Sequence, residues 1–592
     1  MNEITIKNSD WLFNCGILGL YNILRHNKID DGDDISLSHD ELTFPVSRLE
    51  NFEEKYFSYL IDTYEKIFSI YRITSFEKKM QNYEESGFEN FNNRSLDSLN
   101  LQIEQVKRYL KSNSYVSAYE MIESEFYPVA PVAKEKELEK VSLEENENAF
   151  DKKSEIKMQI EILKEIVEFF KRKEVRKYIG GKNAMYSIIK NAWTNISFMN
   201  SKNKNPDMYK EFKDYFIKPV KEYLDEKDSI NLKSKYRCAS CNAKIKNLDI
   251  SLGFMRKIGF DVSRKLSNVW DFNNYVAICP VCRLVYACVP AGFTYLDKRG
   301  IFVNYSMDLQ ESMRINQIIK NEVLSNSEGG TVIYRALQKQ MNKKINETPS
   351  YELSDVQVVR FYRFYNDQDK ESIIYKFNII TKPILKTIEN CEKCFEVIGN
   401  GSFSDGNVTR YLYNEVMNRL MNNENQFLLI QKLMHYKLSM PDKVKYNMNM
   451  IANILEINAE YLKEVGIMEK EAKDMIKTAK SHGFYLQKAY NDYAKKDDSN
   501  SISGAGSNGD KYNKKLGSIA YRMLNTLKTN NKHAFMDIMV NAHMYVQKPI
   551  PAIFAENLEN DLNFKNLGYA FVTGMIGYTG EKKVDEKGNR ED

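Results

Sequence analysis

The chain has 592 residues, of which 43% are hydrophobic and 28% are charged, and its formal net charge at pH 7 is only +4. A length of this order predicts two to four domains with separate cores. The near balance of charge excludes binding to nucleic acid through overall charge, so any basic surface must be local. No apolar run is long enough to span a bilayer, and we expect no membrane segment.

Residues 4–27 predict a short strand followed by a buried helix, with Asp10 placed to cap the helix. Gly16 and Gly19 lie within that helix, where they would let another backbone approach closely. The chain start lacks the basic residues and cleavage site of a signal peptide, and six of the eight cysteines lie in C-x-x-C pairs. We therefore expect a reduced, cytoplasmic protein.

An acidic cluster from Asp30 to Asp34 surrounds Gly32 and resembles a metal-binding loop. Its spacing lacks the alternating ligands and closing glutamate of an EF-hand. It also differs from the acidic turn of palm-domain nucleotide cyclases, because that turn joins two strands late in a domain and this cluster follows an early helix. We interpret the cluster as a solvated loop.

Helical periodicity dominates residues 50–125. Residues 132–157 alternate lysine and glutamate with few apolar anchors, which is typical of a linker or an exposed helix. An amphipathic helix is predicted from about Ser154, because apolar residues recur at helical spacing at Ile156, Ile160, Leu163, Val167 and Phe170. A second helix is predicted over residues 184–199, which include Trp193.

Two C-x-x-C pairs occupy the middle of the chain, at Cys238, Cys241, Cys279 and Cys282. Two thiols on one tight turn can face one point, and a second such pair completes a tetrahedron of thiolates around Zn²⁺. Four sulfur ligands leave no position for water, so the metal is expected to be structural. The alternative is two unrelated reduced pairs.

Paired C-x-x-C motifs also frame some HNH-type nucleases, which need a histidine base and a metal-binding histidine nearby. No histidine lies between Cys241 and Cys279, and the six in the chain are remote in sequence: His26, His39, His435, His482, His533 and His543. The chain also lacks the H-E-x-x-H, G-x-S-x-G and P-loop motifs. With no catalytic constellation, we expect no enzymatic activity.

A third pair, Cys391 and Cys394, has no second pair to complete a metal site. It is interpreted either as an incomplete or competing site, or as two small apolar residues one helical turn apart. Gly504, Gly506 and Gly509 match G-x-G-x-x-G, but the polar stretch before them is no strand, so we interpret the match as a flexible linker.

The segment between the two cysteine pairs is the best local candidate for contact with nucleic acid. Basic residues there interleave with the aromatic residues Phe254, Phe260, Trp270 and Phe272. The alternative is that these aromatic residues form the small core that a zinc module needs. The candidate contacts to the DNA backbone, with two in a basic loop nearby, are Lys202, Lys204, Arg256, Lys257, Arg264 and Lys265.

The run from Val356 to Phe364 is rich in β-branched and aromatic residues and predicts a half-buried strand. From Gly401 onward the pattern is almost entirely helical, with a long loop predicted over 495–510. The apolar stripes of the last helices are Leu516, Ile519, Met523 and Leu527, then Phe535, Ile538, Met539 and Ala542, then Leu567, Phe571 and Met575. Short turns between such stripes predict an antiparallel helical bundle.

The predicted fold is mostly α with mixed α/β portions, in several domains. The expected divisions are an N-terminal, largely helical region at 1–231, a zinc-binding module at 232–300, an α/β connecting region at 301–400, a helical bundle at 401–580 and a disordered tail at 581–592.

Three motifs, in this order, resemble one known family. They are the N-terminal run from Asp10 to Leu20, the two C-x-x-C pairs, and a C-terminal set made of 520–530, 549–551 and 568–571. The chain resembles, nearly from end to end, the large subunit of the type I-B CRISPR Cascade surveillance complex, in its C-x-x-C zinc-finger branch.

The resemblance implies a subunit without catalytic activity that recognises a protospacer-adjacent motif in duplex DNA and helps to separate the strands. The implied partners are the guide RNA, the backbone and 5′-handle-binding subunits, and a helicase-nuclease. The C-terminal bundle resembles the small subunit, which some relatives also make from an internal start; candidate starts are Met434, Met440, Met448 and Met450. The alternatives are a metal-dependent nuclease or cyclase, and a zinc-stapled scaffold.

Overall fold

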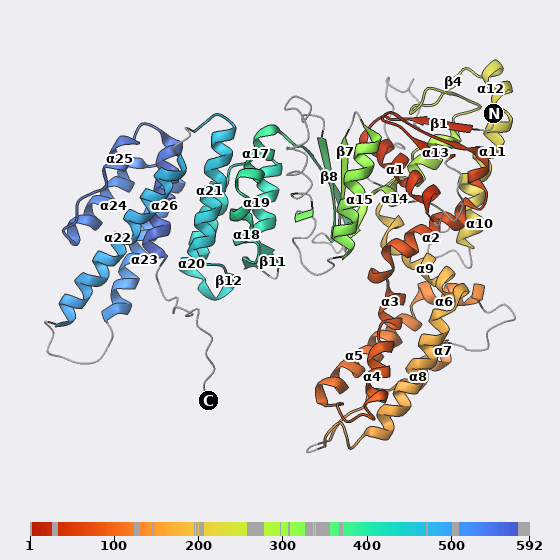
Figure 1. Cartoon of the computed structure of the whole chain (residues 1–592), viewed down its shortest axis with the longest axis horizontal. Helices are drawn as coiled ribbons and strands as arrows, with labels where there is room; N and C mark the ends of the chain where they lie inside the picture. The colour runs from red at the N-terminus through yellow and green to blue at the C-terminus, as the bar shows by residue number, and fades with distance from the viewer. Residues whose placement is uncertain are drawn as a thin grey trace. The chain divides into compact units, whose positions relative to one another are not determined.

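The chain folds into two units in the computed structural model (Figure 1). The first unit holds residues 1–324 and 356–377, and the second holds residues 325–355 and 378–592. The finer divisions drawn from the sequence stay predictions. The structure describes residues 3–26, 34–122, 131–144, 147–194, 196, 199, 207–256, 277–296, 298–305, 308–325, 335–336, 338, 356–365, 371–406, 408–468, 472–499 and 508–577.

The first unit begins with strand β1 (Glu3–Lys7) and helix α1 (Trp11–Arg25). Strands β2 (Ser36–Leu37) and β3 (Glu41–Pro45) complete an antiparallel sheet in the order β1-β3-β2. The Asp10 carboxylate accepts hydrogen bonds from the backbone N–H groups of Leu12 and Phe13, at 2.8 and 3.1 Å. The predicted strand, helix and cap are therefore all confirmed.

Helices make up most of the rest of this unit. They are α2 (Phe52–Tyr64), α3 (Ser69–Thr74), α4 (Glu77–Glu85), α5 (Asn93–Leu110), α6 (Asn113–Ile122), α7 (Pro131–Glu137), α8 (Lys153–Lys171), α9 (Lys173–Ser187), α10 (Met208–Phe212), α11 (Lys218–Asp225) and α12 (Lys227–Lys233). The predicted amphipathic helix is α8, and all five of its predicted apolar residues are buried. The segment rich in lysine and glutamate includes α7 and then packs Leu138 and Val141 into the core.

The helix predicted over residues 184–199 is wrong, because α9 ends at Ser187. Trp193 instead forms an isolated β-bridge with Met255. The backbone N–H of Thr194 donates to the Phe254 carbonyl at 2.7 Å, and the Trp193 ring packs against Phe216. Pairing with a distant segment has therefore replaced local helical hydrogen bonds.

A second sheet in the first unit has the order β6-β7-β8-β9. Its strands are β6 (Thr294–Leu296), β7 (Arg299–Tyr305), β8 (Val356–Tyr365) and β9 (Glu371–Ile379), of which β9 continues into the second unit. Helix α15 (Leu309–Ser325) follows β7. The predicted strand is β8, which is buried at Val358, Val359 and Phe361 and exposed at Phe364.

The second unit is mainly helical, as predicted. Its helices are α17 (Lys382–Asn390), α18 (Glu392–Ile398), α19 (Leu412–Met421), α20 (Phe427–Ser439), α21 (Met448–Glu464), α22 (Ala472–Ser499), α23 (Asn508–Lys528), α24 (Lys532–Tyr545), α25 (Ala552–Glu556) and α26 (Asp561–Ile576). All residues of the predicted apolar stripes are buried except Ile519, which is half-buried. The sequence pattern missed a small sheet of β10 (Ser402–Asp405), β11 (Val408–Tyr411) and β12 (Val444–Lys445).

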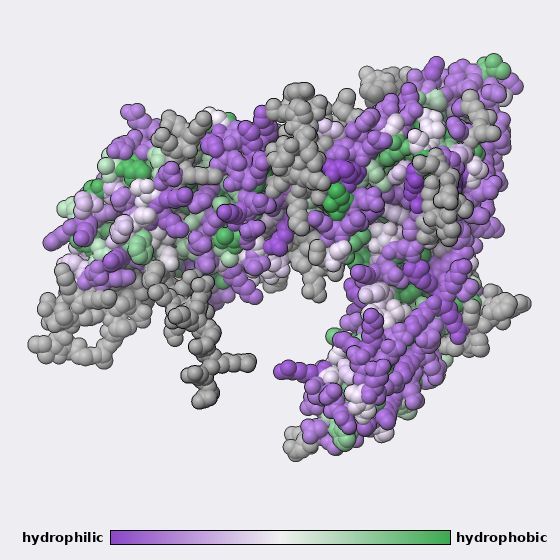
Figure 2. Space-filling view, viewed as in Figure 1, coloured by the Kyte–Doolittle hydropathy of each residue, from purple (hydrophilic) through white to green (hydrophobic). Residues whose placement is uncertain are grey.

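The loop predicted over 495–510 is too long, because α22 continues to Ser499 and α23 begins at Asn508. Of the G-x-G-x-x-G match, residues 504–507 lie outside the described part, and Gly509 belongs to α23. On the face drawn in Figure 2, hydrophilic residues cover most of the described surface, with apolar residues scattered among them. No described helix combines the length and apolar character needed to cross a membrane.

Candidate metal centre

The first cysteine pair lies on a hairpin turn between β4 (Tyr236–Arg237) and β5 (Lys244–Ile245). The Cys238 N–H donates to the Ala243 carbonyl at 2.8 Å, and the Asn242 N–H donates to the Cys238 carbonyl at 2.9 Å. Asn242 has a left-handed backbone with φ of 60°, which asparagine tolerates better than most residues. This tight turn brings the thiols of Cys238 and Cys241 to one site.

The second pair opens helix α13 (Pro280–Ala287), where Cys279 is the N-cap residue. Its Sγ accepts a hydrogen bond from the Cys282 N–H at 3.3 Å, and Pro280 occupies the first turn, where its missing N–H costs nothing. The Cys279 N–H donates to the Sγ of Cys238 at 3.2 Å. This last bond links the two cysteine pairs through one backbone group.

The four Sγ atoms of Cys238, Cys241, Cys279 and Cys282 all lie within 4.8 Å of one another. No disulfide joins them; Cys241 is exposed, and the other three are buried. Hydrogen bonds from the thiols of Cys241, Cys279 and Cys282 lower the pKa of Cys238, whereas hydrogen bonds to Cys238 and burial raise the pKa of Cys279 and of Cys282. The cluster therefore favours one thiolate at Cys238, and a cation is needed before all four sulfurs ionise. Within the described residues, this is the one group of three or more histidine, cysteine or carboxylate side chains able to hold a metal ion.

The second pair is anchored to the N-terminal helix by close backbone contacts. A Cβ at Gly16 would lie under 3.0 Å from the Val285 carbonyl, and one at Gly19 equally close to the Cys288 carbonyl. In the helical turn α14 (Val289–Gly292), a Cβ at Gly292 would meet the Cys15 carbonyl at a similarly short distance. The predicted close approach at Gly16 and Gly19 is thus confirmed, and its partner is the segment that follows the second pair.

Helix α2 holds the same segment from another side. The hydroxyl of Tyr56 donates to the Ala287 carbonyl at 3.0 Å, and that of Tyr59 donates to the Ala291 carbonyl at 3.2 Å. Between the two cysteine pairs, the hydroxyls of Ser240 and Tyr286 lie 3.1 Å apart. The sequence did not predict this contact between hydroxyl groups, because serine and tyrosine are not the residues that usually bind zinc.

Of the six candidate DNA contacts, only Arg256 lies in the described part of the chain. Its side chain is 16% exposed, and its guanidinium forms an ion pair with Glu371 at 2.9 Å and donates to the Lys190 carbonyl at 3.1 Å. The described candidate is therefore engaged inside the first unit. The candidates outside the described residues are Lys202, Lys204, Lys257, Arg264 and Lys265.

The four aromatic residues noted between the two cysteine pairs also lie partly inside and partly outside the described residues. Phe254 is 3% exposed and packs against Trp193 and Phe216, so for Phe254 the interpretation as a core residue is confirmed. Phe260, Trp270 and Phe272 lie outside the described residues.

A basic run extends from the end of α12 through the hairpin. Residues 231–249 contain five basic residues and one acidic residue. Lys233, Lys235 and Arg237 are exposed, next to the half-exposed ring of Tyr236. A count of charge over this short window would have found the run.

The other candidate groups do not join the centre. Asp34 forms an ion pair with Arg48, whereas Asp30 to Asp33 lie outside the described residues. Cys391 and Cys394 are buried in the second unit, where the Cys394 thiol lies 3.7 Å from a carboxylate oxygen of Glu456. The described histidines join no metal-binding group of three or more ligands.

A family model described as "CRISPR-associated protein (Cas_CXXC_CXXC)" matches residues 231–294. The matched range contains both cysteine pairs, helix α13 and helical turn α14. The match supports a CRISPR-associated protein with paired C-x-x-C motifs. No match was found among curated proteins or among solved structures.

Proposed function

We propose that this chain is the large subunit, without catalytic activity, of a type I-B CRISPR RNA-guided surveillance complex. It recognises a protospacer-adjacent motif in duplex DNA, aids strand separation and pairing with the guide RNA, and docks a helicase-nuclease. One observation carries the proposal: the range that matches the CRISPR-associated family holds the four-cysteine centre, and this centre is packed directly onto the N-terminal helix α1. The resemblance between the sequence and the Cascade large subunit supports the finer assignment.

Zn²⁺ is the metal that we assign to this centre. Four cysteine sulfurs within 4.8 Å of one another suit the tetrahedral preference of zinc and its affinity for thiolates. A shell of four sulfurs offers no open position for water or substrate, so the ion would hold the hairpin against α13 and would not activate a nucleophile.

The end of helix α12 and the hairpin β4–β5 together offer a basic surface that suits DNA phosphates. The exposed cations are Lys233 at the end of α12, Lys235 between α12 and β4, and Arg237 on β4, all in the run of net positive charge that includes the first cysteine pair. Zinc binding at Cys238 and Cys241 would hold the segment directly after these cations, which lowers the entropy lost on contact with a phosphate backbone. Lys202, Lys204, Lys257, Arg264 and Lys265 remain proposed contacts.

The assembly is tested by mild affinity purification of the tagged chain from its host, with identification of all bound protein and RNA. We expect short RNAs with a shared repeat-derived end, several protein partners and no nuclease activity in the isolated chain. A chain that purifies alone and without RNA contradicts the proposal. Metal-dependent cleavage of DNA by the isolated chain favours the nuclease alternative, and binding that is insensitive to salt and nuclease favours a scaffold.

The DNA surface is tested by reversing charge at Lys233, Lys235 and Arg237 and measuring duplex affinity against salt concentration. Each lost phosphate contact is expected to reduce the slope of log affinity against log salt by about 0.9. Lys443→Glu, an exposed lysine of the second unit, is the matched control. An unchanged affinity and slope in the triple variant would remove the hairpin from the interface.

A further inference from the structure

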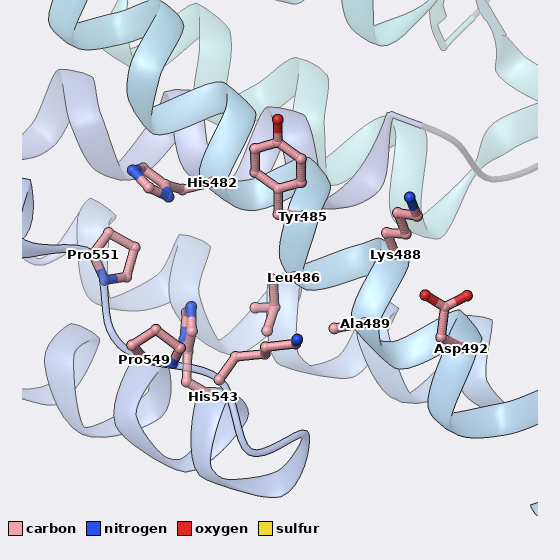
Figure 3. Close-up of a pocket in the computed structure, with 10 residues that line it drawn as sticks. His482, Tyr485, Leu486, Lys488, Ala489, Asp492, His543, Pro549 and Pro551 are labelled. Carbon is pink, nitrogen blue, oxygen red and sulfur yellow. The ribbon is translucent and has the colours of Figure 1, made fainter. Parts of the chain in front are cut away.

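The second unit contains a cavity of about 410 Å³ between helix α22, helix α24 and the segment that follows α24 (Figure 3). Leu486, Ala489 and two prolines give it apolar walls. Its polar lining consists of His482, Tyr485, Lys488, Asp492, His543 and Lys548. A pocket of this size, with apolar and polar side chains in similar share, lies within the size range of small-molecule sites.

The two histidines of the cavity come from different helices. In Figure 3, His482 of α22 and His543 of α24 lie at the same end as Pro549 and Pro551, whereas Asp492 and Lys488 lie at the opposite end. His543 is 3% exposed, and its Nδ1 lies 2.9 Å from the Met539 carbonyl. That hydrogen bond requires a proton on Nδ1, so Nε2 is the nitrogen left for a ligand.

Most of the charged groups in this cavity have no partner in the protein. Among the described residues, the side chains of His482, Lys488 and Asp492 form no hydrogen bond or ion pair, and the same holds for Lys548. By contrast, Lys432 of the same unit forms an ion pair with Asp405 at 2.8 Å. Unpartnered cations around a pocket favour an anionic ligand.

We propose that this cavity binds a phosphate-bearing ligand of mononucleotide size. The phosphate lies near His482 and Lys548, the Nε2 of His543 accepts a hydrogen bond from a hydroxyl or amine of the ligand, and the ring of the ligand packs against Leu486 and Ala489. Asp492, at the opposite end, accepts a hydrogen bond from a sugar hydroxyl or an exocyclic amine. The ligand is either a free nucleotide or the terminal nucleotide of a strand. The inference is independent of the proposed function, because the four-cysteine centre lies in the first unit.

The full chain is titrated by calorimetry with AMP, with inorganic phosphate, and with a short DNA strand that ends in either a 5′-phosphate or a 5′-hydroxyl. The test variants are His482→Gln and Lys548→Met, which change side chains that are not buried and so spare the core. Each is expected to weaken binding about tenfold, the usual effect of losing one hydrogen bond to a charged group. His533→Gln is the matched control, because His533 is exposed on the same helix as His543 but does not line the cavity.

Binding of AMP that both variants weaken identifies a free nucleotide as a ligand. Binding of the 5′-phosphorylated strand alone, again weakened by both variants, identifies a strand end. The proposal is overturned if neither AMP nor the phosphorylated strand binds, if inorganic phosphate alone binds, or if the variants bind as tightly as the wild-type chain.

Discussion

The four-cysteine centre and the contact between α22 and α26 show two ways of holding distant segments together. In both, glycines let backbones touch: Gly16 and Gly19 in the first unit, and Gly483 and Gly574 in the second. A Cβ at Gly574 would lie under 3.0 Å from the Lys480 carbonyl, as one at Gly19 would from the Cys288 carbonyl. The first contact adjoins the four-cysteine cluster that could hold a metal ion, whereas the second joins two helices by packing.

The two units differ in what stabilises them. Four thiols gathered within 4.8 Å need a cation before they can ionise together, so we expect the first unit to depend on a bound metal ion. Helices α22 and α26 need only complementary shape and buried apolar area. Removal of metal should therefore affect one unit and spare the other.

The largest effect is expected from Cys279→Ser. Cys279 supplies one of the four sulfurs, so its replacement is expected to release the metal and unfold the region around the hairpin. Serine keeps the backbone N–H that bonds to Cys238 and can still cap α13, so the effect would come from the lost sulfur ligand. Structural zinc contributes about 10–16 kcal/mol of binding free energy in small zinc modules, and we expect several kcal/mol of that to be lost here. The measurement is zinc content together with thermal unfolding, where only the transition of the first unit should fall.

The control for this substitution is Cys394→Ser in the second unit. Cys394 is buried but belongs to no described metal-binding group, so its variant should keep the full zinc content. Cys279→Ser with one zinc per chain and an unchanged first transition would show that the centre does not depend on metal.

The second largest effect is expected from alanine at one glycine in each of the two backbone contacts, Gly19 in the first unit and Gly574 in the second. Gly19→Ala forces α1 away from Cys288 and should lower both the stability of the first unit and its zinc affinity. Gly574→Ala should lower the stability of the second unit alone, since its Cβ meets the Lys480 carbonyl. Overpacking of this kind costs about 1–3 kcal/mol, measurable by denaturant unfolding with zinc titration alongside.

Gly517→Ala provides the matched control, because nothing lies within 4 Å of a Cβ at this position of α23. It should stabilise the second unit by up to about 1 kcal/mol, the helix propensity gained over glycine. If Gly19→Ala leaves zinc affinity unchanged, the N-terminal helix does not support the metal centre.

The sequence predicted those features that are set by local spacing. The two C-x-x-C pairs, the Asp10 cap and the stripe of α8 are each defined within a few residues, and all appear as predicted. The glycines of α1 also stood out, because two occur close together in one apolar helix. Gly483 and Gly574 did not stand out, since Gly483 is alone in α22, Gly574 lies six residues after Gly568 in α26, and their contact joins segments far apart in the chain.

Long-range pairing explains the errors as well. Trp193 lies in a stretch with helical periodicity, but the backbone there bonds to residues near Phe254. Arg256 was assigned to DNA because its neighbours in sequence are basic and aromatic, and Glu371, its partner in an ion pair, is remote in sequence. Local composition cannot reveal a counterion that another part of the fold supplies.

The third effect tests the assignment of Arg256 to the protein interior. Arg256→Met leaves Glu371, which is 15% exposed, with the weaker partners Lys190 at 3.3 Å and Arg363 at 3.6 Å. We expect a loss of about 1–3 kcal/mol from the first unit, the usual cost of removing a hydrogen bond to a charged group. Denaturant unfolding measures it, and Lys78→Met, at an exposed lysine of α4 in the first unit, is the control. A variant that unfolds like the wild type but binds duplex DNA more weakly would return Arg256 to the DNA surface.

The smallest effect is expected on acidification, which distinguishes the units by their chemistry. Protons compete with the metal for thiolates, so the first unit should lose its metal and its stability before the second unit responds.

In the second unit, the ammonium of Lys432 beside Asp405 lowers the pKa of that carboxyl from its ordinary 3.8. Because the pKa is lower in the folded state, the stabilisation is complete above pH 3.8 and is lost as the pH falls through the folded value. Unfolding of the second unit, followed between pH 5 and pH 2, should therefore be less pH-dependent in Asp405→Asn than in the wild type. Equal pH dependence in the two chains would mean that Asp405 does not contribute to stability through its charge.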